Sequence, residues 1–152
     1  MKFNSQICTT REQSERLLSL GLKKETADMV HCIKTRNHLG DEIERHSYYS
    51  FETEVDERPL GYANYEHSLA WSLCRLLSLL PKYIRVRKES FGRFRWTTLE
   101  LTIDAEFVVW YREDIDNSAV DENFYAEDIY TSLCDCIEWL IKEGYFNKEY
   151  LI

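Results

Sequence analysis

The longest run of apolar residues in the chain extends from Ser68 to Pro81 and predicts a buried helix. Its leucines and its tryptophan recur at spacings of three and four residues, so the helix should be apolar over most of its circumference. Ser68 is a suitable N-cap, and Pro81 cannot continue a helical hydrogen-bond ladder. We therefore expect a central helix over residues 69–80, with the rest of the chain packed around it.

Two further helices are predicted, one on each side of this run. The first covers residues 10–20, begins with a capping-box pattern and ends at Gly21. The second covers residues 124–143, carries one apolar stripe and ends at Gly144. Two capping pairs fit the first helix equally well: Thr9 with Glu12, and Thr10 with Gln13.

Alternation of apolar and polar residues predicts strands between the second and third helices. Three strands over residues 83–88, 94–103 and 107–112 are joined by short turns and form an antiparallel meander. The third is apolar on both sides, so it belongs inside the sheet or beneath a helix.

The middle third of the chain has the weakest pattern. Only residues 48–55 alternate like a strand, and turn-forming residues interrupt the remainder. We expect mostly loop there, with residues 37–45 and 57–66 as candidate surfaces for partner contact. Together, these helices and strands predict a single α+β domain over residues 1–152, with two or three helices packed on a mainly antiparallel sheet.

Composition agrees with a folded protein of the cytoplasm. The chain has 152 residues, of which 44% are hydrophobic and 14% aromatic. It lacks an apolar run of signal-peptide or membrane-spanning length, so no membrane partner is expected. The cysteines are odd in number, at five, and predict reduced, mostly buried thiols.

Charge is unevenly distributed along the chain. The formal net charge is −8, yet residues 82–96 carry +5. We expect the arginines of this hairpin to share one face beside an aromatic ring, as a candidate binding surface for phosphates or single strands. This surface consists of Arg85, Arg87, Arg93, Arg95 and Trp96. The favoured alternative is a solvated face neutralised by the chain's own acidic residues, because the overall field repels phosphate.

Residues 113–128 form the acidic counterpart of this hairpin: they contain seven carboxylates and no basic residue. They lack the glycine and the ligand register of a calcium loop. We read them as a loop that leads into the last helix, or as a mimic of a nucleic-acid backbone for a basic partner. Pairing of this segment with the basic hairpin of a second copy would give a homodimer.

No pattern in the sequence supports catalysis or a cofactor. His31, Cys32 and His38 are the nearest approach to a zinc site or a Cys/His nucleophile pair, but neighbouring strand residues face opposite ways and no fourth ligand is indicated. Phosphate-binding loops, nucleophile elbows and zinc-protease motifs are also missing from the sequence. We expect no metal, no cofactor and no enzymatic activity; a metal-dependent hydrolase is the disfavoured third class.

Two segments, Thr9–Leu22 with Thr26–Met29 and Ala70–Pro81, resemble an uncharacterised group of small proteins of phages and mobile elements in Bacteroides-type bacteria. The resemblance implies a shared fold and a mobile-element setting, and it supplies no reaction, ligand or catalytic residue. The expected function is that of a non-enzymatic accessory protein acting through protein contacts. The alternative is a nucleic-acid-associated module that uses the basic hairpin.

Overall fold

The computed structural model describes residues 6–37, 43–50, 63–90, 93–103, 108–113 and 120–152. The chain divides into two compact units, residues 1–75 with Ile152 and residues 76–151, and the boundary falls within helix α2 (Leu73–Leu79). Each unit contains helix and antiparallel sheet, so the chain is an α+β protein, as predicted. No helix in the described ranges is long and apolar enough to span a membrane. A single domain over residues 1–152 stays a prediction.

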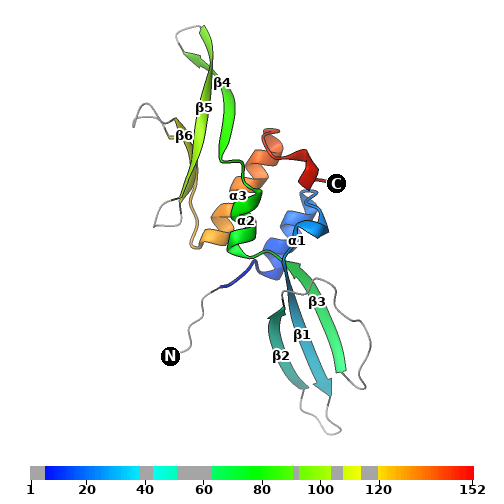
Figure 1. Ribbon diagram of the computed structural model, residues 1–152. Coiled ribbons are helices and arrows are strands. Elements are labelled where there is room, and N and C mark those ends of the chain that lie inside the picture. The colour runs from blue at the N-terminus through cyan, green and yellow to red at the C-terminus, as the bar shows by residue number, and fades with distance from the viewer. Residues whose placement is uncertain (1–5, 38–42, 51–62, 91–92, 104–107, 114–119) are drawn as a thin grey trace. The chain divides into compact units, whose positions relative to one another are not determined.

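The first unit contains a three-stranded antiparallel sheet (Figure 1). Strand β1 (Met29–Asn37) lies in the middle, between β2 (Ile43–Ser50) and β3 (Ala63–Ala70). Met29, Val30 and Cys32 are buried on β1. Helix α1 (Arg11–Ser19) packs against β3, and a 3-10 turn (Lys24–Thr26) leads into β1.

Helix α1 begins and ends as its sequence predicts. Of the two capping pairs, the protein uses Thr10 with Gln13: the Thr10 hydroxyl accepts from the Gln13 N–H, and the Gln13 side chain accepts from the Thr10 N–H. Thr9 is buried and bonds elsewhere. Gly21 follows the helix with φ of 91°, a conformation that disfavours other L residues.

Trp71 is the centre of the first unit. Its side chain is fully buried, and its indole N–H donates to the Thr26 hydroxyl at 3.0 Å. Its backbone N–H donates to the Thr9 hydroxyl, and its carbonyl accepts from the Thr9 N–H, both at 2.9 Å. Asp28 accepts from the Ser72 N–H at 2.8 Å, so the corner between β3 and α2 is fixed by side chains from the first thirty residues.

The predicted helix over residues 69–80 is wrong at its beginning. Residues 68–70 belong to β3, where Ala70 pairs with Met29 and Leu69 with Val30, and α2 begins only at Leu73. Ser72, not Ser68, accepts from the N–H of the first turn, at Arg75. A continuous apolar run fits a buried strand as well as a buried helix, and pairing with β1 decides the outcome. Although most of its residues are apolar, the helix is buried on one side only: Leu76 and Leu79 are buried, whereas Cys74 is exposed.

The expectation of loop in the middle third is also wrong. Residues 29–37 and 63–70 are strands, and the strand predicted near 48–55 is β2, at 43–50. Its partner is β1, and it lies in a different sheet from residues 83–112. Residues 38–42 and 51–62, which hold parts of the two candidate contact loops, lie outside the described ranges.

The second unit contains a four-stranded antiparallel sheet in the order β4-β5-β6-β7. The strands are β4 (Tyr83–Ser90), β5 (Arg93–Ile103), β6 (Val109–Glu113) and β7 (Val120–Phe124). The predicted meander is confirmed, and β6, apolar on both sides, lies between two strands. Helix α3 (Ile129–Lys142) packs against β6 and β7.

Strand β7 replaces part of the predicted acidic loop and of the predicted helix over 124–143. Asp121 and Glu122 lie within it, and the helix begins at Ile129 because Asp128 caps it. An edge strand leaves one side of its backbone unpaired and tolerates charged residues, so its acidic composition concealed it. Residues 114–119 lie outside the described ranges.

Trp139 joins helix and sheet in the second unit through aromatic contacts. Its ring centroid lies 6.0 Å from that of Tyr111 on β6 and 5.7 Å from those of Phe124 and Tyr145. The Tyr111 hydroxyl donates to the Pro81 carbonyl at 2.6 Å, which ties β6 to the start of β4.

Loss of the Thr26 hydroxyl should destabilise the protein. Thr26→Val keeps the shape of the side chain but leaves the buried indole N–H of Trp71 without its acceptor. We expect a loss of about 1–3 kcal/mol in the free energy of unfolding, measured by urea denaturation. Thr98→Val is the matched control, because Thr98 is exposed on β5 and the same change there should stay within about 0.5 kcal/mol. Equal losses in the two variants would contradict the role of the bond.

The cap of α3 provides a second test. Asp128 accepts from the Thr131 N–H at 2.9 Å and from the Thr131 hydroxyl at 2.7 Å. Asp128→Ala should reduce the free energy of unfolding by about 1 kcal/mol, whereas Asp128→Asn keeps an acceptor oxygen and should lose less than half of that. Thermal denaturation of the two variants side by side tests the order; an asparagine variant as unstable as the alanine variant would argue against a capping role.

Candidate binding surface

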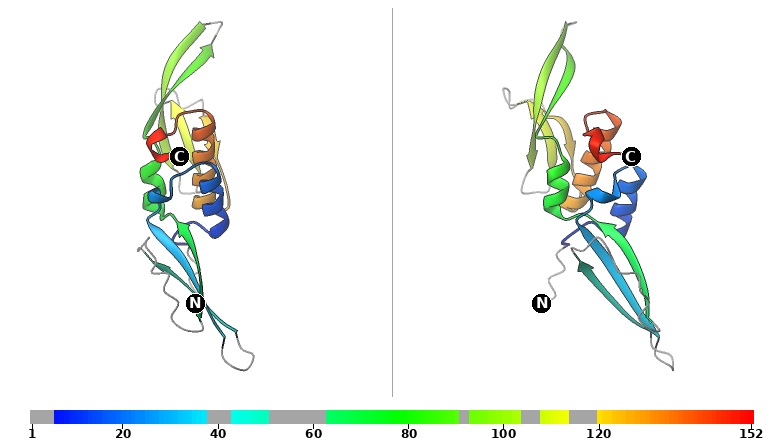
Figure 2. Two further views of the ribbon diagram at one scale, coloured as in Figure 1. Left: turned by 90° about the vertical axis from the view of Figure 1, so that its right-hand side faces the viewer. Right: turned by 45° about the vertical axis from the view of Figure 1, so that its right-hand side comes forward.

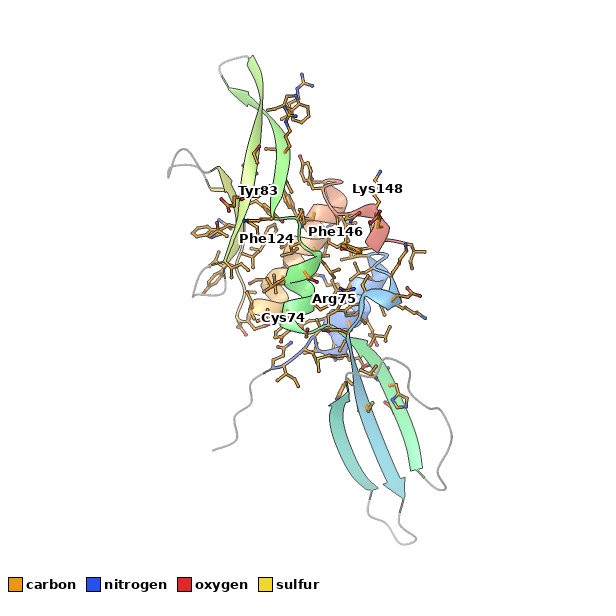
Figure 3. All side chains as sticks on the ribbon, viewed as in Figure 1. Cys74, Arg75, Tyr83, Phe124, Phe146 and Lys148 are labelled. Atoms are coloured by element: carbon orange, nitrogen blue, oxygen red, sulfur yellow. The ribbon has the colours of Figure 1, made fainter. Side chains whose placement is uncertain are left out.

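Strand β4 alternates between buried and exposed side chains. Ile84 and Val86 are buried, whereas Tyr83, Arg85 and Arg87 are exposed. Successive residues of a strand face opposite sides, so the three exposed side chains share one face of the hairpin formed by β4 and β5. Tyr83 is 53% exposed although it is aromatic, and Figure 3 shows it near the start of β4.

Trp96 from β5 completes this face. It is 60% exposed, and the guanidinium carbon of Arg85 lies 5.2 Å from its ring centroid. The Lys82 ammonium lies 5.2 Å from the centroid of the Tyr83 ring in the same manner. Both distances suit cation–π attraction. We call this set the basic–aromatic face: Lys82, Tyr83, Arg85, Arg87 and Trp96.

The register divides the four predicted arginines into two pairs. Arg87 lies directly opposite Trp96 and Arg85 opposite Thr98, whereas Arg93 and Arg95 lie opposite Ser90 and Lys88. Directly opposite residues of an antiparallel pair share a face, so the register groups Arg85 and Arg87 with Trp96 and places Arg93 and Arg95 at the alternate positions. The side chains of Arg93 and Arg95 lie outside the described part of the structure. The site is therefore built on Arg85 and Arg87.

The hairpin carries this face beyond the four-stranded part of the sheet. Strand β5 pairs with β6 from Leu99 onward, whereas its earlier residues pair with β4. Figure 2 shows the two strands as a ribbon that extends past β6. Trp96 and Arg87 lie on this two-stranded part.

A second arrangement, which the sequence did not indicate, joins Cys32 and His67. The two residues are directly opposite on β1 and β3, with 3.3 Å between the Cys32 sulfur and the His67 Nδ1. Only strand pairing could reveal it, because 35 residues separate them. Cys32 is 1% exposed, so substrate cannot reach the sulfur as it would reach a nucleophile. In the described part of the chain, no three His, Cys, Asp or Glu residues form a metal cluster.

Cys8 and Cys136 are buried thiols with raised pKa values. Burial, with a smaller effect of Asp28, raises the pKa of Cys8 to about 11. Burial also raises the pKa of Cys136, with a contribution from Asp135. Both thiols are therefore protonated at neutral pH, and a protonated thiol is a poor nucleophile and metal ligand. His31 and Cys32 are successive residues of β1 and so face opposite sides of the sheet; His38 lies outside the described ranges.

No protein-family model matches the chain, and comparisons with curated proteins and with solved structures also find no match. The basic–aromatic face is therefore the feature from which we infer function.

Thiol exposure gives a direct test of the packing. All five cysteines are free, four are buried, and Cys74 on α2 is exposed (Figure 3). At neutral pH we expect one thiol per chain to react rapidly with a colorimetric disulfide reagent and all five to react after denaturation. Cys74→Ser should abolish the rapid phase. A rapid phase that persists in Cys74→Ser would show that one of the buried thiols is accessible.

Proposed function

We propose that this protein is a binding module without catalysis of its own, which engages an acidic segment of another protein through the basic–aromatic face. The observation that carries the proposal is the cation–π pair of Arg85 and Trp96, both exposed on a hairpin with charge +5 in a chain of charge −8. Arginine, tryptophan and tyrosine are the residues that most often anchor protein interfaces.

Exposure of these aromatic rings supports a contact role. Trp96 and Tyr83 each leave more than half of their surface to water, and covering such rings is the largest gain that an interface obtains from single residues. The contact with Trp96 also restricts the Arg85 guanidinium, which lowers the entropy lost when it meets a carboxylate.

The simpler explanation is a solvated hairpin with no partner. Basic residues on an exposed strand prevent aggregation even when they bind nothing. That explanation accounts for Arg85 and Arg87, but it gives no reason for two large exposed rings beside them. A partner accounts for both.

Single-stranded nucleic acid is the second candidate ligand, favoured by the same rings, on which bases stack. It is the weaker candidate because a polynucleotide carries a phosphate at every step, and the net charge of the chain, −8, repels a long polyanion. A short acidic segment of a protein confines its charges to the hairpin.

The proposed setting is a phage or mobile element, where the module acts as an accessory to a protein of that element. This part of the proposal is supported by the resemblance of Thr9–Leu22 and Ala70–Pro81 to small proteins of such elements.

Charge reversal tests the proposed surface. We expect the protein to bind a fluorescein-labelled glutamate peptide of about eight residues at low salt, and the double variant Arg85→Glu with Arg87→Glu to bind at least about tenfold more weakly, because two attractive contacts become repulsive. Fluorescence anisotropy is the measurement. The matched control reverses two other exposed basic residues, Lys24 and Lys148, and changes the net charge equally; it should retain binding.

Three results would contradict the proposal. They are an absence of binding of the glutamate peptide at low salt, an equal loss in the control variant, and a clear preference for oligothymidine over the glutamate peptide. The last would establish the nucleic-acid alternative in its place.

A further inference from the structure

The basic–aromatic face is ordered in three rows across the hairpin of β4 and β5. Directly opposite residues of an antiparallel pair share a face, and so do alternate residues of each strand, so the rows follow one another along one side of the hairpin. Each row offers a partner a different chemistry. The rows are Tyr83 opposite Glu100, Arg85 opposite Thr98, and Arg87 opposite Trp96.

The first row presents an aromatic ring between charges of opposite sign. Tyr83 is 53% exposed, and its hydroxyl donates to the Glu100 carboxylate at 3.4 Å. The Lys82 ammonium lies 5.2 Å from the centroid of the same ring. Because one cation and one anion lie beside the ring, this row gives a carboxylate no net attraction, and it favours an apolar side chain.

The middle row presents a positive charge. Arg85 is exposed, and within the described ranges it forms no ion pair. Its contact with Trp96 engages the electrons of the indole ring and does not neutralise the guanidinium. Thr98, opposite Arg85, is small and exposed, so a carboxylate of a partner can reach the guanidinium in this row.

The third row presents the ring of Trp96, which is 60% exposed. Arg87 lies opposite this ring but already interacts within the protein, so the indole is what this row offers a partner. The face therefore carries a ring, a cation and a ring in succession. Neighbouring rows are two residues apart along each strand, which corresponds to about 7 Å.

We infer that the acidic segment of the partner lies extended along this face, with an apolar side chain, a carboxylate and a second apolar side chain at alternate positions. The inference rests on the proposed function and specifies its ligand. An extended chain has the same rise per residue as the strands beneath it, so its alternate side chains repeat at the spacing of the rows. The carboxylate then meets Arg85, and the two apolar side chains cover Tyr83 and Trp96. This pattern is the same from either end, so it fits the face in both chain directions.

Peptide order tests the inference. Two fluorescein-labelled peptides of about eight residues, the length of β4, share one composition of phenylalanine, glutamate and serine. In the first, a glutamate lies midway between two phenylalanines that are four positions apart, the separation of Tyr83 and Arg87. In the second, the phenylalanines are adjacent, and an extended chain directs them to opposite sides. We expect the first peptide to bind at least about fivefold more tightly by anisotropy, because it covers both rings at once.

Ring variants show whether the first peptide lies on this face. Trp96→Thr and Tyr83→Thr should each weaken its binding at least about threefold, because one apolar side chain loses the ring that it covers. Tyr125→Thr is the matched control: Tyr125 is 72% exposed and follows β7, outside the basic–aromatic face, so this variant should bind the peptide as tightly as the unchanged protein does.

The outcomes separate this inference from the proposed function. Equal affinities for the two peptides, or an equal loss in the Tyr125 control, would overturn the inference, while the proposed function would still stand on the glutamate peptide. An absence of binding by all three peptides would remove both. Self-association in sedimentation that Trp96→Thr abolishes would assign the face to a second copy of the chain and would overturn a separate partner.

Discussion

Burial of Trp71 is the constraint on which the first unit depends. An indole without contact to water must place its N–H on an acceptor, and the Thr26 hydroxyl supplies one at 3.0 Å. The same residue exchanges backbone hydrogen bonds with Thr9, so one side chain and its backbone join three segments that are far apart in the sequence. The turn from β3 into α2 occurs where these bonds hold the chain.

The second unit is organised by a different constraint, the need to cover one face of a four-stranded sheet. Trp139 of α3 contacts Tyr111 and Phe124 from the sheet, and Ile84 and Val86 turn their side chains to the interior. Alternation along β4 then leaves Tyr83, Arg85 and Arg87 outside. The exposed face is therefore a consequence of core packing. Its chemistry is that of the alternate residues of β4, which the core does not bury.

That chemistry is unusual for surface that serves only to keep a protein soluble. A scattered charge on an edge strand is sufficient for that purpose. Here a guanidinium lies over an exposed indole and an ammonium lies over an exposed phenol. Affinity from aromatic contacts and selection by charge would arise at one place on the hairpin.

Local pattern was sufficient for the features that depend on near neighbours. The α+β class, the capping box of α1, the glycines that end α1 and α3, and the meander over residues 83–112 all follow from sequence spacing, because caps, turns and strand alternation involve residues a few positions apart. The basic hairpin and its exposed tryptophan could also be located in this way. Acidic β7 was missed because an edge strand need not be apolar.

The other features of the fold depend on pairing between segments that are distant in the sequence. Residues 68–70 form a strand because β1 lies beside them, and β1 and β3 themselves were read as loop because each gains its stability from the other. The division of Arg85 and Arg87 from Arg93 and Arg95 depends on a register that a shift of one residue would invert. Residue types and their alternation along each strand can be read from the chain. Which residues of neighbouring strands share a face follows from the hydrogen bonds between the strands, and these leave no mark in local spacing.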